Sequence, residues 1–248
     1  MAISKSLRKK MEARKKNIKS KSSGLGYLII KEGTIRVRPL RVPPEEEPAI
    51  EVIQFYFGGE LGGMISPASV GLKCAVNEFY IDAMKGKDKG KKKLAGKIAP
   101  KSRFMMPVAK FEDTKGKVLD ERDSPKLVLM TGGLYQQCID VFTDMDDWGD
   151  FTDPDEGYDL KLSRSGTGQY DTEYSASPCP KTPAPKQFRK KIFDAAEMLK
   201  DILPTYEETK EKLEEWLSTV DVDDDEDNKK GSGKKKLKLN KKKSKGDL

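Results

Sequence analysis

Positively charged side chains stand next to aromatic rings in two stretches of the chain, and chemistry can be argued from this pairing. The first stretch, KIAPKSRF (97–104), places Lys101 and Arg103 beside Phe104. Cations can follow the phosphates of a nucleic acid strand, and an aromatic face can stack on an unpaired base of any sequence. The combination points to single-stranded nucleic acid as a ligand.

The second stretch is a hairpin pattern in which Lys161 and Arg164 lie close in sequence to three tyrosines. Tyr158 shares a strand face with two leucines, so we expect it in the core. Tyr170 lies beside a glycine-rich turn among polar residues, so exposure is expected there. Each of these rings, Tyr174 included, could equally be a core residue.

Enzymatic chemistry has little support in the residue types. The chain contains no histidine, which excludes Ser-His-Asp and Cys-His catalysis. Its three cysteines, Cys74, Cys138 and Cys179, form no CxxC pair, and their odd number fits a reducing compartment better than a disulfide framework. The acidic stretch DMDDWGDFTDPDEG (144–157) lacks EF-hand spacing, so a solvated loop is favoured over a cation site or a cation-dependent nuclease. We therefore expect a protein that is not an enzyme and holds no metal or cofactor.

The net charge of +7 conceals a strong segregation of charge. Residues 1–22 carry +8, residues 85–103 carry +8 and residues 229–248 carry +9, whereas residues 221–228 carry −6. Three basic segments on an otherwise acidic body favour a polyanionic partner. No apolar run approaches the roughly 18 residues that span a bilayer, and the N-terminus lacks a signal-peptide core, so no membrane association is expected.

Hydrophobic periodicity predicts a β-rich body interrupted by helices. Strand patterns cover residues 34–41, 50–57, 102–112, 126–130 and both arms of the hairpin at 158–174. Helix patterns cover residues 66–84, 132–144, 188–203 and 205–220, and a lysine/glycine loop is expected at 85–97. Short strands with basic and aromatic residues interleaved predict a mainly β, α+β fold: an OB-fold barrel with helical insertions and C-terminal helices.

Three local patterns make specific structural predictions. In the first strand, Ile35 and Val37 alternate with Arg36 and Arg38, which is a half-buried pattern. In the third strand, Phe104, Met106 and Val108 are expected to share one face. Thr205 and Glu208 form a capping-box pattern for the last helix, which should turn Leu213, Trp216, Leu217 and Val220 inward.

The order of these motifs resembles that of the helix-destabilising single-stranded DNA-binding proteins of T-even-like phages. An N-terminal basic arm precedes TIRVRPL and an acidic turn (34–47). The other similar segments are KIAPKSRFMMPVAKFED (97–113), KLVLMTGGLYQQCIDVF (126–142), EGYDLKLSRSGTGQYDTEYS (156–175) and FDAAEMLKDILPTYEETKEKLEEWL (193–217).

The resemblance covers roughly residues 1–220. It implies cooperative coating of single-stranded DNA during phage DNA replication, recombination and repair, in the cytoplasm of the infected bacterium. Expected partners are single-stranded DNA, further copies of the chain, and replication and recombination proteins bound through the C-terminal tail. The implied organisation is a basic self-association arm (1–22), an OB-fold DNA-binding core (23–187) and C-terminal helices packing on the core (188–220). The low-complexity composition of residues 221–248 predicts a disordered acidic-then-basic tail.

Two sets of site residues are expected. The DNA-binding set, with Phe104 and Tyr170 as the stacking rings, is Lys91, Lys92, Lys93, Lys97, Lys101, Ser102, Arg103, Phe104, Lys161, Arg164 and Tyr170. The self-association set, which the resemblance implies would dock on a neighbouring copy, is Lys5, Arg8, Lys9, Lys10, Arg14, Lys15 and Lys16.

The chain departs from the family at two places. The family prototype holds zinc with one histidine and three cysteines after the second strand, whereas only Cys74 stands in that region here, so no zinc is expected. The apolar residues of Leu72–Ala83 are expected to pack that subdomain instead. The prototype also ends in an acidic tail, but here the acidic block Asp221–Asp227 is followed by the lysine-rich segment Lys229–Lys245.

Two other kinds of function remain open from the sequence. The chain could be a general RNA or duplex-DNA binder that acts through the charge of its tails alone. It could also be a protein-interaction or scaffolding factor that uses the basic arm and the C-terminal helices.

Overall fold

The computed structural model describes residues 26–112, 125–144, 148–166 and 171–220, with the side chains of residues 110–112 excepted. The self-association arm with the seven residues of the self-association set, Tyr170 and the 221–248 tail lie outside the described residues.

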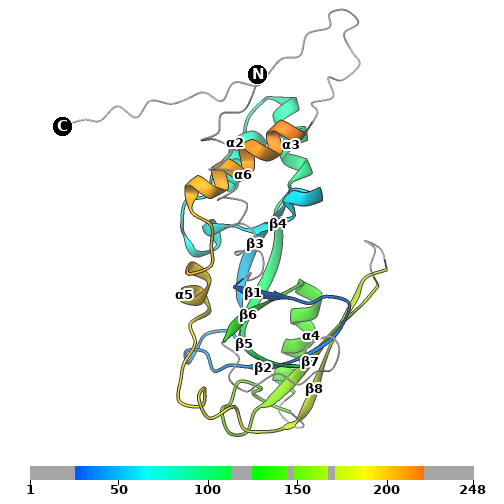
Figure 1. Cartoon of the computed structure of the whole chain (residues 1–248), viewed down its shortest axis with the longest axis vertical. Coiled ribbons are helices and arrows are strands. Elements are labelled where there is room, and N and C mark those ends of the chain that lie inside the picture. Colours follow the sequence, from blue (N-terminus) through cyan, green and yellow to red (C-terminus); the bar gives the residue numbers. More distant parts are fainter. Residues whose placement is uncertain (1–25, 113–124, 145–147, 167–170, 221–248) are drawn as a thin grey trace, which may run out of the picture.

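The molecule is elongated, with a sheet body at one end and a helical module at the other (Figure 1). The strands are β1 (Tyr27–Ile29), β2 (Gly33–Pro39), β3 (Ile50–Tyr56), β4 (Gly63–Ile65), β5 (Lys101–Glu112), β6 (Lys126–Met130), β7 (Tyr158–Ser165) and β8 (Glu173–Lys181). The helices are α2 (Ala75–Lys85), α3 (Lys89–Lys97), α4 (Gly132–Thr143), α5 (Ala195–Lys200) and α6 (Tyr206–Thr219), with 3-10 turns η1 (Gly59–Leu61) and η2 (Pro67–Val70).

One large, mostly antiparallel sheet organises the body. Its strands follow the order β1-β6-β5-β2-β7-β8, and β3 pairs with both β5 and β4. Only β1 and β6 run parallel among these pairs. Within the described residues β1 and β8 each pair with a single neighbour, so the sheet is open. The expected α+β class is confirmed, whereas a closed OB-fold barrel is not.

The inner face of the sheet carries the main hydrophobic core, as the alternation on β5 predicted. Met106 and Val108 are fully buried there, and Phe104 packs against the same cluster. Tyr158 is fully buried too, which confirms its predicted core position. Its hydroxyl donates to the Gly149 carbonyl at 2.9 Å, and burial raises its pKa.

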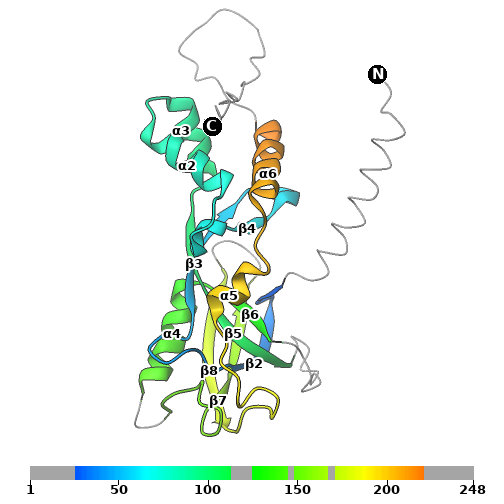
Figure 2. The same cartoon turned by 90° about the vertical axis from the view of Figure 1, so that its left-hand side faces the viewer.

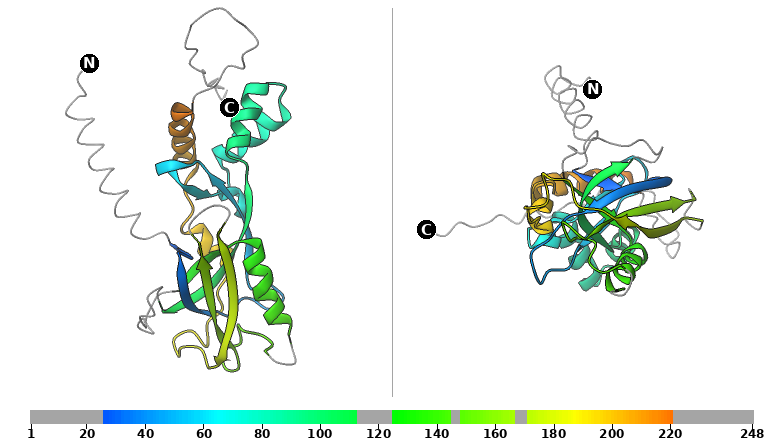
Figure 3. Two further views of the ribbon diagram at one scale, coloured as in Figure 1. Left: turned by 90° about the vertical axis from the view of Figure 1, so that its right-hand side faces the viewer. Right: turned by 90° about the horizontal axis from the view of Figure 1, so that it is seen from below.

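The two sides of the sheet are covered by different helices. Helix α4 lies along β7 and β8 at the inner face (Figure 3). Helix α5 lies against β3, β5 and β6 on the opposite, outer face (Figure 2), where Leu199 packs with Val52, Met105 and Leu127. None of the described helices is both long enough and apolar enough to cross a membrane.

The helical module has its own core, built from segments far apart in the chain. Phe55 of β3 and Phe57, just after it, meet Val76 of α2 and Trp216 of α6 there. The Trp216 ring lies edge-on to Phe57, with ring centroids 6.0 Å apart. Leu213 and Trp216 are buried as predicted, and the Thr205 capping box is present. The sequence did not indicate that α6 would pack on α2 rather than on the sheet body.

Cys74 is buried in the module core. Helix α2 begins only at Ala75, because Gly71, at φ +77°, ends η2 and a short connection follows. Leu72, predicted on the packed face, therefore lies outside the helix and is 49% exposed. The described residues contain no group of three or more potential metal ligands.

Two predicted boundaries were wrong. Most of the expected 85–97 loop is helix α3, because the Asp88 side chain accepts from the Lys91 amide and buried Leu94 and Ala95 anchor the helix. The expected 188–203 helix is shortened to α5, because the Asp194 side chain caps the amides of Ala196 and Glu197, so the helix begins there.

The alternation on β2 also misplaced one arginine. Arg36 is half-buried, but Arg38 is fully buried. Its guanidinium donates to the carbonyls of Thr182 (2.6 Å) and Asp153 (2.8 Å) and lies 3.5 Å from the Asp159 carboxylate. The loop that precedes β7 covers Arg38 on the outer face. This loop lies more than 100 residues from Arg38 in the sequence, so the local alternation on β2 did not indicate the burial.

Candidate nucleic-acid interface

Helix α3 presents a dense cluster of cations at the module end of the molecule. All five of its lysines are exposed: Lys89, Lys91, Lys92, Lys93 and Lys97. Lys89, Lys93 and Lys97 are spaced i, i+4, i+8 and therefore lie in one row on the helix surface. The structure thus places four members of the expected DNA-binding set on one short helix.

The cations of α3 continue into the start of β5. Lys97 ends α3, and Lys101 begins β5 four positions later. Lys101 and Arg103 pair in register with Gln54 and Val52 of β3, so both lie on the outer face. The Arg103 Nε donates to Gln54 Oε1 at 3.2 Å, which fixes the direction of this side chain.

Ser102 and Phe104 point to the opposite face, because successive side chains of a strand alternate. The Ser102 hydroxyl donates to Glu51. The Phe104 ring stacks on Tyr135 of α4, with centroids 4.4 Å apart and planes at 22°. One face of the Phe104 ring is therefore covered by Tyr135. Of the four residues of the KSRF stretch, only Lys101 and Arg103 lie on the outer face, so the four do not line one groove.

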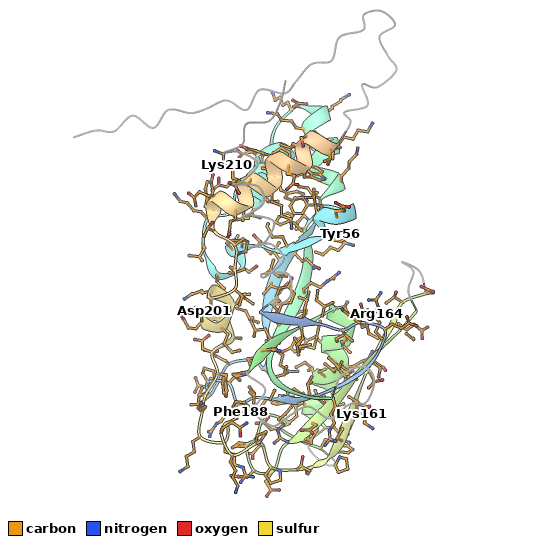
Figure 4. All side chains as sticks on the ribbon, in the orientation of Figure 1. Tyr56, Lys161, Arg164, Phe188, Asp201 and Lys210 are labelled. Carbon is orange, nitrogen blue, oxygen red and sulfur yellow. The ribbon has the colours of Figure 1, made fainter. Side chains whose placement is uncertain are left out.

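Lys161 and Arg164 lie in the sheet body, apart from the α3 cluster (Figure 4). Strand β2 separates β7 from β5. Lys161 is exposed on the outer face opposite Arg36, whereas Arg164 is half-buried on the other face. Its guanidinium lies 5.9 Å from the centre of the Tyr174 ring. The structure does not bring these two cations together with the lysines of α3.

One exposed aromatic residue at this surface, Tyr56, the last residue of β3, was not among the expected site residues. Its side chain is 55% exposed, whereas the neighbouring rings of Phe55 and Phe57 are buried. It lies two residues beyond Gln54 and thus shares the outer face with Lys101. The signal was weak, because the 50–57 strand is apolar on both faces and its rings could not be sorted into buried and exposed from the sequence.

A second basic cluster also went unnoticed, at the other end of the molecule. Exposed Lys186, Lys190 and Lys191 surround buried Phe188 in the turn before α5. Figure 4 shows Phe188 in the sheet body, far from α3. This distal cluster offers a charge-matched control for experiments on α3.

Two carboxylates of the acidic loop, those of Asp150 and Asp153, accept hydrogen bonds from the loop itself. Asp150 accepts from the amide and the hydroxyl of Thr152, both at 2.7 Å. Asp153 accepts from the amides of Glu156 and Asp155, and these bonds hold the pKa of its carboxyl below the usual value. Both carboxylates therefore help to fix the backbone of the loop before β7.

No model of a known protein family matches the chain, and comparison with curated proteins finds no match. Function is therefore argued from the geometry of the surface formed by α3 and the start of β5.

Proposed function

We propose that the chain is a non-enzymatic single-stranded DNA-binding protein, which coats single strands during phage DNA replication, recombination and repair. The observation that carries the proposal is the basic surface of α3 and of the start of β5, which follows α3 after three residues. We call this the α3–β5 surface and define it by Lys89, Lys91, Lys92, Lys93, Lys97, Lys101 and Arg103.

The charge of α3 works against the helix in isolation. Like charges at i, i+4 destabilise a helix by roughly 0.2–0.5 kcal/mol per pair, and the row Lys89-Lys93-Lys97 contains two such pairs. The Asp88 cap and the burial of Leu94 and Ala95 offset this repulsion. A row of phosphates would neutralise it directly and release counterions, which is the main source of affinity in nucleic acid binding.

The sheet supports an OB-like arrangement as part of the proposal. Strand β5 pairs with β6 along one edge. Along its other edge it pairs first with β3, at residues 101–105, and then with β2, at residues 108–112. The part of the helical module that contains α2 and α3 is inserted between β3 and β5, and α6 completes the module from the C-terminal end. A partly open barrel with an inserted module presents an outer strand face to a single strand, as OB-folds do.

Titration with a short single-stranded oligonucleotide at several salt concentrations tests the proposal. The logarithm of the affinity should fall linearly with the logarithm of salt concentration, at about 0.7 for each phosphate neutralised. Replacing Lys89, Lys91, Lys92 and Lys93 with Gln should weaken binding and lower this slope by about 0.7 for each phosphate that the variant no longer neutralises.

The matched control replaces the three distal lysines, Lys186, Lys190 and Lys191, with Gln. It removes nearly the same charge but leaves the α3–β5 surface intact, so affinity should change much less. An equal loss of affinity in both variants would contradict a localised site.

Removal of both tails separates the proposal from a general polyanion binder. A chain of residues 23–220 retains every described residue. We expect it to bind single strands more tightly than duplex, because stacking needs unpaired bases. Loss of all affinity would favour binding by the charge of the tails alone, and no binding by the full chain at physiological salt would favour a protein-interaction role.

A further inference from the structure

The exposed ring of Tyr56 lies beside the cations of β5, at the end of the strand that enters the helical module. We propose that Tyr56 is a stacking platform for one unpaired base of a single strand bound on the α3–β5 surface. This inference rests on the proposed function and adds to it the residue that distinguishes unpaired bases from a bare phosphate chain.

The register places the ring and the cations on the same face. Gln54 lies opposite Lys101 and accepts from Arg103. Tyr56 follows Gln54 by two residues, about 7 Å along the strand. A base on the ring would therefore have its flanking phosphates within reach of Lys101 and Arg103.

The neighbouring strand leaves the ring uncovered. The cross-strand partner of Tyr56 on β4 is Gly63, which has no side chain to lie over it. On the other side, β5 begins at Lys101, opposite Gln54, so β5 has no strand residue opposite Tyr56. A large aromatic ring that is 55% exposed and has no cross-strand side chain is a surface open to a flat ligand.

The backbone that carries Tyr56 is held on both sides. Phe55 and Phe57 insert into the module core on the opposite face. The Phe57 amide donates to the Gly62 carbonyl at 2.9 Å, which closes the hairpin between β3 and β4. The ring is thus presented by a rigid hairpin, and stacking of a base on it costs little ordering entropy on the protein side.

The test measures binding of the full-length protein to an oligodeoxythymidylate strand by fluorescence anisotropy. Tyr56→Leu keeps a bulky apolar side chain but removes the π face, and it should lower affinity roughly 5- to 150-fold, the range for loss of one base–aromatic stack. Tyr56→Phe keeps the π face and should bind within about twofold of the wild type. A loss in Tyr56→Phe as large as in Tyr56→Leu would overturn stacking in favour of a role for the hydroxyl.

Tyr206→Leu is the matched control for removal of an exposed tyrosine. Tyr206 is 36% exposed at the start of α6, and its hydroxyl donates to Glu78 at 2.9 Å. This variant should bind like the wild type. An equal loss in Tyr206→Leu and Tyr56→Leu would contradict a specific role for Tyr56.

A second titration uses a strand of equal length in which the sugars are abasic. The wild type should prefer the strand with bases, and Tyr56→Leu should lose most of that preference, which is the coupling measured by a double-mutant cycle. If the full chain binds neither strand, the proposed function fails. If it binds but Tyr56→Leu keeps wild-type affinity and preference, only the assignment of Tyr56 fails.

Discussion

At the scale of single residues, the charged side chains of Arg38 and Asp153 hold the loop before β7 against β2. Arg38 is fully buried, and its hydrogen bond to the Asp153 carbonyl ties this loop to the sheet. The Asp153 carboxylate organises the same loop from the other side by accepting the amides of Asp155 and Glu156. The ionised form of Asp153 is therefore favoured in the folded state.

The free energy of unfolding should depend on pH through Asp153. Since the folded-state pKa lies below the ordinary value of 3.8, its contribution is fully present above about pH 4 and is lost as pH falls through the folded-state pKa. Asp153→Ala should cost about 1 kcal/mol for each hydrogen bond that it removes at pH 7. The difference from the wild type should shrink on acidification, as measured by denaturant titration.

Asp153→Asn is the control, because it keeps an acceptor oxygen without the titrating charge. The difference in free energy of unfolding between Asp153→Asn and Asp153→Ala should stay nearly constant as the pH falls through the acid range. A wild-type advantage over Asp153→Ala that did not fall at low pH would contradict this account.

At the scale of elements, helix α3 carries much of the α3–β5 surface, and its sequence argues against a helix. Five lysines and two glycines make up seven of its nine residues, and only the other two, Leu94 and Ala95, are buried. Burial of these two residues and the Asp88 cap decide the conformation. In an isolated peptide this segment would form little helix.

Gly96→Ala tests whether residues 89–97 are helical in solution. A Cβ added at Gly96, in the last turn of α3, meets no atom within 4 Å, and alanine is favoured over glycine at helical positions. We expect the free energy of unfolding to rise by roughly 0.5–1 kcal/mol, as measured by denaturant titration.

Gly71→Ala is the paired control, because a Cβ at Gly71 also meets nothing within 4 Å but its backbone has φ +77°. Alanine is strained in that region, so this variant should be destabilised. Destabilisation by Gly96→Ala would indicate that the segment is not a helix.

At the scale of the whole molecule, the C-terminal helix completes a module that is inserted in the middle of the chain. Trp216 of α6 is buried against Phe57, which follows β3, and Phe79 of α2. The module presents the lysines of α3, so the geometry of the proposed DNA surface depends on a helix more than 100 residues further along the sequence. Folding of this surface therefore requires long-range contacts.

Trp216→Ala should lower the free energy of unfolding by about 3–5 kcal/mol, the usual cost of removing a buried tryptophan. Hydrogen exchange should show the loss of protection concentrated in amides of α2 and α3, with β7 and β8 less affected, because these strands belong to the other core. Lys210→Ala, at an exposed position of the same helix, should stay within about 0.5 kcal/mol of the wild type. Uniform loss of protection over both parts would show that they unfold as one unit.

The sequence by itself determined the features that depend on neighbouring residues. Strand β6 has the predicted bounds, the inner face of β5 carries Met106 and Val108, and Thr205 caps α6. Alternation, helical spacing and capping act over a few residues, so these patterns can be recognised without the fold.

Only the tertiary structure decided which surfaces are covered. Arg38 was expected on the half-exposed side of β2 but is buried by a loop from far along the chain, and Phe104 was expected to meet a base but is stacked on Tyr135. Tyr56 could not be separated from Phe55 and Phe57 until the helical module covered one face of β3 and left the other open. Burial depends on contacts between distant segments, and local sequence patterns carry no information about which segments will meet.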